Sequence, residues 1–520
     1  MITYIVSAFS CVAAALMLMA PTSARANWYE VSSDHFIIYA DAQKEEVVRF
    51  AEDLERFHSL MEHSTGRELA KPGPSNRITV FAAGSEKRVR ALAGASDVAG
   101  FYLPRWQGSV AFVQNVQTKR GRRDLATTIL LHEYVHHFFA STDRFTMPLW
   151  MNEGAAEFFS NVAFYPDGSA IAGLRPAHRS FTTVWLEHER TPVTELLAIN
   201  WQNLSARNAA AKDSFYSNSW LLYHYLATTE DRSGQLRGYW LEVLKGAPSL
   251  AAAQGVFGDL GPLQRQIVSH YKNKNRPTFR IESDQLPVGP YSVRALNEGE
   301  VASVATRMRL ERGIPPDEAK NAAARLRSIA TRFPGNASVM ALLAQAEYAA
   351  GRDMMAIAAA DRAIKLDATA VDAYVYKGSA AFRQARLLAD PAKKAAAYRR
   401  AMEPFEALQQ IDNKHIAPLI YTYRSYLERN VAASDDAKAA LVRAAQLAPF
   451  DQELWLITGM MHINDGRIGA SRDALAPLAT NPHGGEKSEQ VKALLNFLAD
   501  KPEGQAIPLQ KAISGYFLSE

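Results

Sequence analysis

The sequence contains almost no cysteine and little excess charge. Cys11 is the only cysteine in 520 residues, which excludes a disulfide framework and a cysteine-ligated metal site within the chain. Lys and Arg number 58 against 54 Asp and Glu, a formal net charge of +4. This near balance argues against nucleic acid or an anionic membrane surface as a partner. With 48% apolar residues, a chain of this length predicts two or three packed domains.

A long uncharged apolar run occurs at the N-terminus. Residues 1–26 combine it with the small-x-small ending Ala24-Arg25-Ala26, which is typical of a cleaved secretory signal peptide. The run from residue 5 to residue 20 is short for a membrane span. No Lys or Arg precedes it, so an uncleaved anchor facing the extracytoplasmic side is the alternative. We expect an exported protein, periplasmic or extracellular, with no stable membrane span after cleavage.

The segment from His132 to His136 has the pattern H-E-x-x-H, and apolar residues on both sides predict a largely buried helix. On a helix, histidines four residues apart lie on one face, about 6 Å apart along the axis. Both imidazoles can then bind one zinc ion. In this pattern Glu133 is the general base that activates a zinc-bound water. A catalytic zinc needs one further protein ligand and one position for water.

A second helix is expected to supply the remaining ligand. Residues 140–148 are rich in polar residues and end in Pro148, which favours a loop followed by a helix start. The segment L-W-M-N-E-G-A-A-E comes next, and its Glu153 is the candidate ligand. Two helices joined by such a loop can face each other. The sequence therefore predicts a zinc site made by His132, His136 and Glu153.

These two segments resemble the gluzincin metallopeptidases, and W-M-N-E-G-A-A is most similar to W-L-N-E-G-F-A of the aminopeptidase-N family. The resemblance implies that Glu153 is the third ligand of one Zn²⁺ per chain. Slightly fewer residues separate the two segments than in that family, and its amine-binding G-x-M-E-N motif is absent. Exopeptidase activity is therefore not implied. The broad peptidase MA-like gluzincin group, often joined to tetratricopeptide repeats, is the most similar group.

The resemblance also suggests supporting roles. In thermolysin-like gluzincins an acid at the position of Glu157 orients the first histidine by a hydrogen bond. The alternatives are that Glu157 is itself a ligand or is a solvated surface acid.

A tyrosine or histidine donor often stabilises the oxyanion of peptide hydrolysis. Tyr216 is favoured because related sequences have a similar Y-x-x-S-W pattern, although a buried structural tyrosine is equally compatible with the sequence. The other candidates are Tyr223, His224 and Tyr225, with His178 and His188 weaker.

Alternation and periodicity predict the elements around the motif. Strands are expected at 28–41, 77–83 and 110–116, with helices at 42–63 and 85–92. In gluzincins the strand ahead of H-E-x-x-H forms the edge of the cleft and pairs with the substrate backbone. The resemblance assigns that role to residues 108–115, and an interior strand is the alternative. Helical patterning returns near 235–245 and 263–271, which predicts an α-rich rear half.

The composition changes at residues 273–302, where Lys, Asn, Pro and Gly predict a linker between a domain at 27–272 and repeats at 303–515. Short strands are possible near Phe279 and Tyr291. A 34-residue period follows, typical of tetratricopeptide repeats, and an insertion near 387–393 predicts a longer turn or helix. With Ala337 as position 1, the repeat's characteristic positions are occupied by Ala344, Gly351, Ala356, Ala363 and Leu366. Such arrays form all-α solenoids whose concave face usually binds peptides or proteins.

The expected protein is an α+β, gluzincin-like zinc metallopeptidase domain, with an N-terminal mixed sheet and an α-rich rear half, followed by a tetratricopeptide solenoid. Its expected partners are a peptide or protein substrate and a protein bound by the repeats. The alternative is a non-catalytic zinc-binding scaffold in which the repeats mediate protein–protein interaction. An intact Glu133 argues against a dead enzyme.

Overall fold

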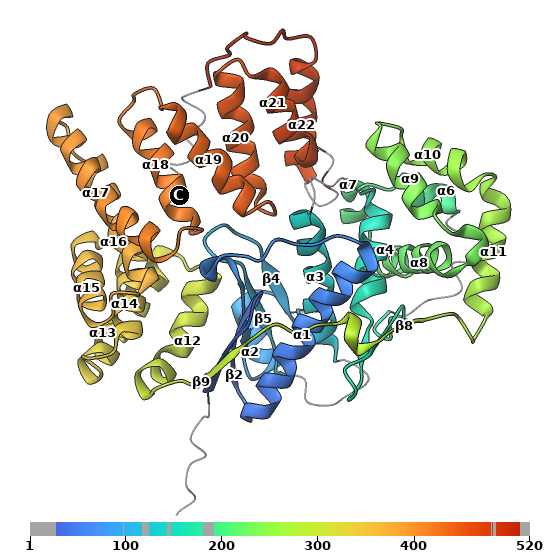
Figure 1. Cartoon of the computed structure of the whole chain (residues 1–520), viewed down its shortest axis with the longest axis horizontal. Coiled ribbons are helices and arrows are strands. Elements are labelled where there is room, and N and C mark those ends of the chain that lie inside the picture. The colour runs from blue at the N-terminus through green and yellow to red at the C-terminus, as the bar shows by residue number, and fades with distance from the viewer. Residues whose placement is uncertain are drawn as a thin grey trace, which may run out of the picture.

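The computed structural model describes residues 28–96, 98–116, 124–142, 147–179, 192–479, 481 and 485–509. The expected signal peptide, the candidate His188 and the end of the expected repeat domain lie outside these ranges. A six-stranded sheet with its helices occupies the centre, a helical lobe lies on one side, and a helical array runs along the other side and over the top of the sheet (Figure 1). This arrangement confirms the coarse prediction of a domain with an N-terminal sheet followed by an all-α repeat array.

The central sheet is mixed, with the strand order β4-β5-β3-β2-β1-β9. Its strands are β1 (Trp28–Ser32), β2 (Phe36–Asp41), β3 (Ile78–Ala82), β4 (Phe101–Leu103), β5 (Val110–Val113) and β9 (Ser292–Ala295). Strands β2, β3 and β5 run parallel, whereas β1, β4 and β9 are antiparallel to their neighbours. Residues 28–41, expected as one strand, form a hairpin that turns where the Ser33 amide donates to the Phe36 carbonyl at 2.9 Å.

Helices cover both faces of this sheet. They are α1 (Lys44–Thr65) and α3 (Leu125–Thr142) on one face, and α2 (Glu86–Ala93) and α12 (Glu298–Arg312) on the other. Strand β2 shows the alternation that produces the two cores. Ile38 packs into the core with α1 and α3, whereas Tyr39 packs with Val89 of α2 and Met308 of α12. The first helix of the expected repeat domain therefore belongs to the core of the sheet.

One expectation about the strands is wrong and another is confirmed. The strand expected at the cleft edge is β5, which lies between β4 and β3 and is buried along its length, so the interior-strand alternative holds and β4 forms the edge. The expected linker contains the two short strands considered possible near Phe279 and Tyr291: β8 (Phe279–Ile281), which pairs with β7 (Ala170–Ala172), and β9, which pairs with β1. The sequence left these pairings open because the partners of a short strand are chosen by long-range packing and hydrogen bonds rather than by local pattern.

The rear lobe is α-rich, as predicted. Its elements are α4 (Leu149–Ser160), β6 (Ala163–Phe164), β7, α6 (Val193–Ala198), α7 (Trp201–Ser205), α8 (Ala209–Thr228), α9 (Gln235–Leu244), α10 (Ser249–Phe257) and α11 (Leu260–Lys272). Strands β6, β7 and β8 form a second, three-stranded sheet. Short 3₁₀ turns occur at Pro74–Asn76, Glu230–Arg232 and Ser283–Gln285. Helix α10 is an addition to the predicted elements.

The helical array continues from α12 in helices that pack on one another in chain order. They are α13 (Pro316–Arg332), α14 (Ala337–Ala349), α15 (Asp353–Leu366), α16 (Val371–Arg386), α17 (Pro391–Ile411), α18 (Ile416–Glu428), α19 (Asp435–Leu447), α20 (Gln452–Asn464), α21 (Ile468–Ala479) and α22 (Gly485–Leu498). Helices α14 and α16 begin one predicted period apart, and the insertion near 387–393 leads into the long α17.

Small residues hold the array together. Ala344, Ala356 and Ala363 are fully buried, as their repeat positions predict. A Cβ on Gly378 would lie 2.5 Å from the Phe405 ring, so α16 and α17 need glycine there to approach each other.

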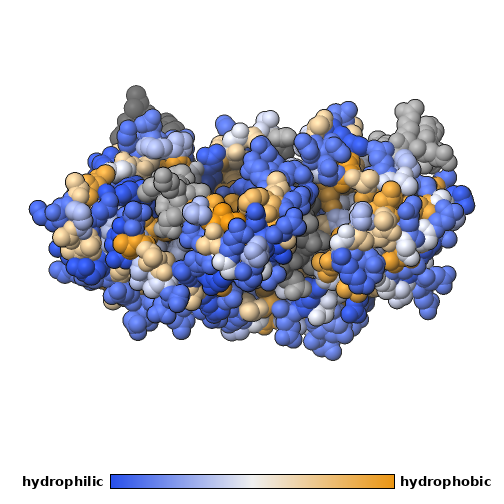
Figure 2. Space-filling view, turned by 90° about the horizontal axis from the view of Figure 1, so that it is seen from above, coloured by the Kyte–Doolittle hydropathy of each residue, from blue (hydrophilic) through white to orange (hydrophobic). Residues whose placement is uncertain are grey.

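Hydrophilic residues cover most of the upper face, with separate hydrophobic patches between them (Figure 2). Among the described helices, we find none with the length and apolar character needed to span a membrane.

Candidate metal centre

Helix α3 presents the H-E-x-x-H residues on one face. Asp124 caps its start, accepting a hydrogen bond from the Thr127 amide at 2.7 Å. Tyr134, Val135 and Phe138 are buried in the core beneath the helix. The half-buried face carries His132, Glu133 and His136, all of which line one cavity. The 3.6-residue period of a helix separates these two faces, so the local sequence suffices to place them.

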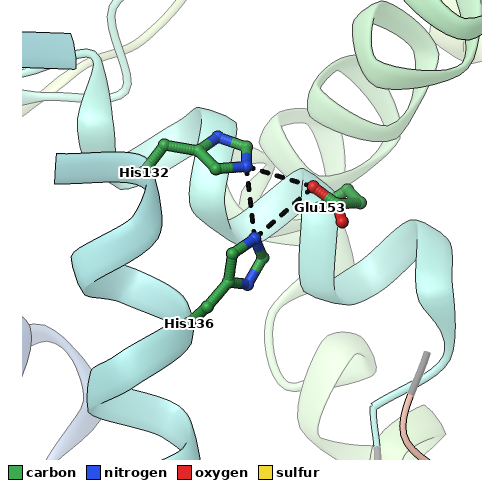
Figure 3. A group of neighbouring side chains, drawn as sticks. All are labelled: His132, His136 and Glu153. Atoms are coloured by element: carbon green, nitrogen blue, oxygen red, sulfur yellow. Dashed lines mark hydrogen bonds and ion pairs between the residues drawn. The ribbon is translucent and has the colours of Figure 1, made fainter. Parts of the chain in front are cut away.

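Helix α4 brings Glu153 to the same point, and its side chain points toward both histidines (Figure 3). The Oε2 atom of Glu153 lies 3.1 Å from His132 Nε2 and 3.6 Å from His136 Nε2. The two Nε2 atoms are 3.2 Å apart. The structure thus brings together three side chains that the sequence analysis had selected as ligands.

The separations fit a single small metal ion. Ligands about 2.0–2.1 Å from a tetrahedral zinc stand about 3.3–3.4 Å apart, and the three measured distances lie around that value. Two imidazole nitrogens and one carboxylate oxygen also form a donor set found in catalytic zinc sites, which keep one ligand position open. The residues present therefore fit zinc in both chemistry and geometry.

Electrostatics favour a positive charge at this point. Burial by itself lowers the pKa of His132, but its contacts with Glu153 and Glu157 outweigh burial and raise that pKa to about 10. Both carboxylates are almost completely buried, so they draw a compensating charge to the imidazole. A proton or a metal ion can provide this charge.

The outer nitrogens of both histidines also have partners. Glu157 Oε1 lies 3.4 Å from His132 Nδ1, and Asn152 Oδ1 lies 3.2 Å from His136 Nδ1. Such contacts fix the ring orientation of a metal-ligating histidine. Glu157 is fully buried, so the surface-acid alternative is wrong. Asn152 was missed by the sequence analysis, although it directly precedes Glu153 in the N-E-G segment.

A further layer surrounds Glu157. Arg179 donates from Nε to Glu157 Oε1 at 3.0 Å, and His178 Nε2 lies 3.3 Å from Glu157 Oε2. Burial raises the pKa of Glu157, but His132, His178 and Arg179 hold it well below its usual range. From the sequence, His178 was only a weaker candidate for the oxyanion donor, and Arg179 was not a candidate for any role. Both lie in a loop, where no local periodicity indicates their contact with α4.

Tyr216 of α8 reaches the same cavity, its ring centroid 6.3 Å from that of His132. Arg179 lies over its ring at 4.3 Å. Burial, reinforced by Glu153, raises the pKa of Tyr216 far above its usual value, so the phenol keeps its proton and can donate it in a hydrogen bond.

The rival donors face other parts of the lobe. His224 Nδ1 lies 2.8 Å from His270 Nε2, Tyr225 donates to Gln266, and Tyr223 packs on Phe158.

Gly154 sets the distance between α4 and α8. A Cβ at this position would lie 2.5 Å from the Ser219 carbonyl oxygen of α8, and backbone cannot move aside as a side chain can. The glycine of N-E-G thus permits the close contact that brings Tyr216 toward Glu153.

The cavity at the cluster has a volume of about 390 Å³. Its walls come from α3, α4, Trp201 of α7 and Tyr216, with Tyr102 and Pro104 at the edge strand. The array completes the enclosure through residues between Pro449 and Asn481.

Comparisons with known proteins give a partial picture. No family model matches the chain. An uncharacterized protein of Bacillus subtilis (strain 168), YhcO, is 30% identical over 142 residues, which is 25% of this chain and 42% of that protein. The chain therefore spans less than half the length of the curated relative it matches.

Solved structures show distant similarity. The tetratricopeptide-repeat protein TTC0263 of Thermus thermophilus aligns with 39% of this chain and 97% of its own, at 14% identity and a TM-score of 0.30. MamA from Desulfovibrio magneticus RS-1 aligns with 39% of this chain and 98% of its own, at 16% identity and a TM-score of 0.26.

Proposed function

We propose that this protein is a zinc-dependent peptidase that hydrolyses internal or terminal peptide bonds of a protein or peptide substrate. The supporting observation is the convergence of His132, His136 and Glu153 at zinc-like spacing, with Glu133 in the same cavity. Bound zinc would lower the pKa of a coordinated water and polarise the scissile carbonyl. The gluzincin resemblance of these segments supports the same reaction.

The chain's own groups supply the remaining chemistry. Glu133 is placed to take a proton from the attacking water and to deliver it to the leaving amine. Tyr216 donates a hydrogen bond to the carbonyl oxygen as negative charge develops there. Asn152 and Glu157 keep the two imidazoles oriented.

The substrate backbone has a place to bind. Strand β4 lies at the edge of the sheet, and Tyr102 and Pro104 in or beside it line the cavity. An extended peptide can add to such an edge through backbone hydrogen bonds. In this proposal β4, and not the strand within residues 108–115, forms the edge of the cleft that binds the substrate backbone. The N-terminal sequence features support a location outside the cytoplasm.

Glu133→Gln tests the proposal. The parent should hold one zinc and cleave an unfolded protein substrate, while Glu133→Gln should keep its zinc and lose about 10²–10⁴ in rate, the usual contribution of general acid–base catalysis. Metal analysis and a cleavage assay measure the two quantities. Glu86→Gln, at the exposed start of α2, is the control and should behave as the parent. Equal cleavage by parent and Glu133→Gln would reject the proposal.

The second candidate function is a non-catalytic scaffold, in which zinc is structural and the array binds a protein partner. It is favoured by the array itself, which is built from successively packed helices like a repeat solenoid. Such solenoids present extended surfaces to peptides and proteins. Zinc retention without cleavage would select this function.

A further inference from the structure

We propose that the C-terminal part of the array is the specificity wall of the cleft, and that it receives an apolar side chain next to the scissile peptide bond. This inference deepens the proposed hydrolysis and rests on it. It differs from the expectation that the repeats recruit a partner at a separate concave face.

The lining of the cavity carries the argument. Phe139, Met147 and Trp201 come from the N-terminal region, and Phe450, Trp455 and Leu478 come from the array. Among the described lining residues, the charged side chains are the carboxylates Glu133 and Glu153, apart from any protonated imidazole. Charged chemistry is thus concentrated on α3 and α4, whereas the array presents mainly aromatic and aliphatic surface, with Gln452 and Asn481 as its uncharged polar groups.

The array is fixed against the sheet side of the cleft. Asp451 directly follows Phe450 in the chain, and its Oδ2 atom accepts a hydrogen bond from the Trp106 amide at 2.8 Å. The ring of Phe450 lies 4.6 Å from that of His137, centroid to centroid. Ser75 Oγ donates to Asp412 Oδ2 at 2.7 Å further along the same side. These contacts hold the apolar wall at a defined distance from α3.

The array also reaches the rear side of the cleft. Helix α22 packs against α7, and Trp201 of α7 lies beside Gly485 at the start of α22. Figure 1 shows α20 to α22 above β4 and α3, with α22 next to α7. Since the array contacts both sides, it bridges the cleft and leaves part of it open to solvent.

The dimensions and chemistry of the enclosed space define its occupant. A volume of about 390 Å³ lies in the range of ligand pockets, about 300–1,000 Å³, and admits a short extended segment rather than a folded domain. An acidic side chain would meet Glu133 and Glu153, and a polar one would lose hydration against Phe450 and Leu478. An apolar side chain avoids both costs, and its presence or absence changes rates by about 10- to 200-fold per group in such pockets.

Cleavage-site mapping tests the wall. A random-sequence peptide mixture is digested by the zinc-loaded parent, Phe450→Ala, Leu478→Ala and Phe333→Ala, and products are sequenced by mass spectrometry. The parent should enrich Leu, Ile, Phe or Met at one position flanking the cut by about 10-fold or more. Phe450→Ala and Leu478→Ala should reduce this enrichment several-fold while zinc content stays unchanged. Phe333, a half-buried aromatic at the other end of the array, is the matched control and should not alter it.

A binding measurement separates the two proposals. Zinc-loaded Glu133→Gln is titrated with blocked alanine peptides that carry a central Leu, Ser or Asp, with and without Phe450→Ala. Tighter binding of the Leu peptide that disappears with Phe450→Ala supports the wall, even if the parent cleaves nothing and the hydrolytic proposal fails. Cleavage with unchanged site preference in both Phe450→Ala and Leu478→Ala overturns the wall and leaves hydrolysis standing. Equal binding of all three peptides also overturns the wall.

Discussion

Buried carboxylates in the array and in the candidate metal centre have different neighbours. Glu347 of α14 and Glu153 of α4 are each only 1% exposed. Glu347 accepts hydrogen bonds from Arg327 Nε at 2.7 Å and from Arg352 Nε at 2.5 Å. Guanidinium groups are permanently charged, so the negative charge of Glu347 is neutralised at every pH at which the protein is folded.

Glu153 instead faces the Nε2 atoms of His132 and His136. An imidazole can give up its proton and coordinate a metal ion instead, so the positive charge beside this carboxylate is exchangeable. The two sites therefore compensate a buried carboxylate in different ways. Arginine forms a permanent ion pair, whereas two histidines can bind a cation in place of a proton. The predictions below test this distinction.

The largest effect is expected from removing the two carboxylates in turn. Glu153→Ala should abolish stoichiometric zinc binding, because one of three ligands is lost. Glu347→Ala should leave zinc at one per chain but destabilise the array by about 1–3 kcal/mol, since two arginines lose hydrogen bonds to a buried carboxylate but remain partly solvated. Metal analysis after dialysis and urea unfolding provide the two readouts. If Glu347→Ala also removed zinc, the two carboxylates would not be functionally distinct.

A smaller effect is expected from arginines that contact an acid and an aromatic ring. Arg179 bonds Glu157 and lies over Tyr216, and Arg383 of the array bonds Asp353 and lies over Tyr348. Arg179→Ala should weaken zinc affinity by about 10- to 100-fold, because it supports the partner of a ligand.

Arg383→Ala, the matched control, should leave zinc affinity unchanged. Competition with a zinc-chelating dye measures both variants. Equal affinities in the two variants would show that the layer behind Glu157 does not tune the metal centre. Partial rescue by Arg179→Lys would show that charge contributes.

The smallest and most gradual effect concerns pH. Burial, aided by neighbouring His35, lowers the pKa of His58 from 6.5 to about 3, and burial with His270 lowers that of His224 to about 3. The unfolded chain binds these protons first, so their contribution to stability is complete above pH 6.5 and is lost as the pH falls toward 3. In the array, Arg386 and Arg424 outweigh burial and lower the pKa of Glu428, so its contribution is lost only below about pH 4.5.

Metal-free protein should therefore lose more stability in the N-terminal region than in the array as the pH falls from about 6.5 to 4.5. His58 and His224 each contribute on the order of 1 kcal/mol per pH unit to the N-terminal loss, whereas in the array burial lowers the pKa of His415. Hydrogen exchange at several pH values resolves the two regions. His58→Gln should make the N-terminal pH dependence shallower and leave the array unchanged. Equal weakening of both regions would contradict this difference.

Much of the architecture was predictable because it is written in local patterns. The helix at 42–63 matches α1, and the strand at 77–83 matches β3, because the spacing of apolar residues in a long segment indicates its secondary structure. The pairing of β9 with β1 and the edge position of β4 were not predictable. Strand β4 has only three residues, which carry little pattern, and β9 pairs with a strand far away in the sequence.

The sequence by itself placed His132, Glu133 and His136 on one face, because helix geometry fixes that relation over five residues. It also indicated Glu153, through a second short motif. Only the tertiary structure brought Arg179 behind Glu157 and Phe450 over α3. These contacts join segments tens to hundreds of residues apart, and packing of whole elements against each other, rather than any local period, decides them.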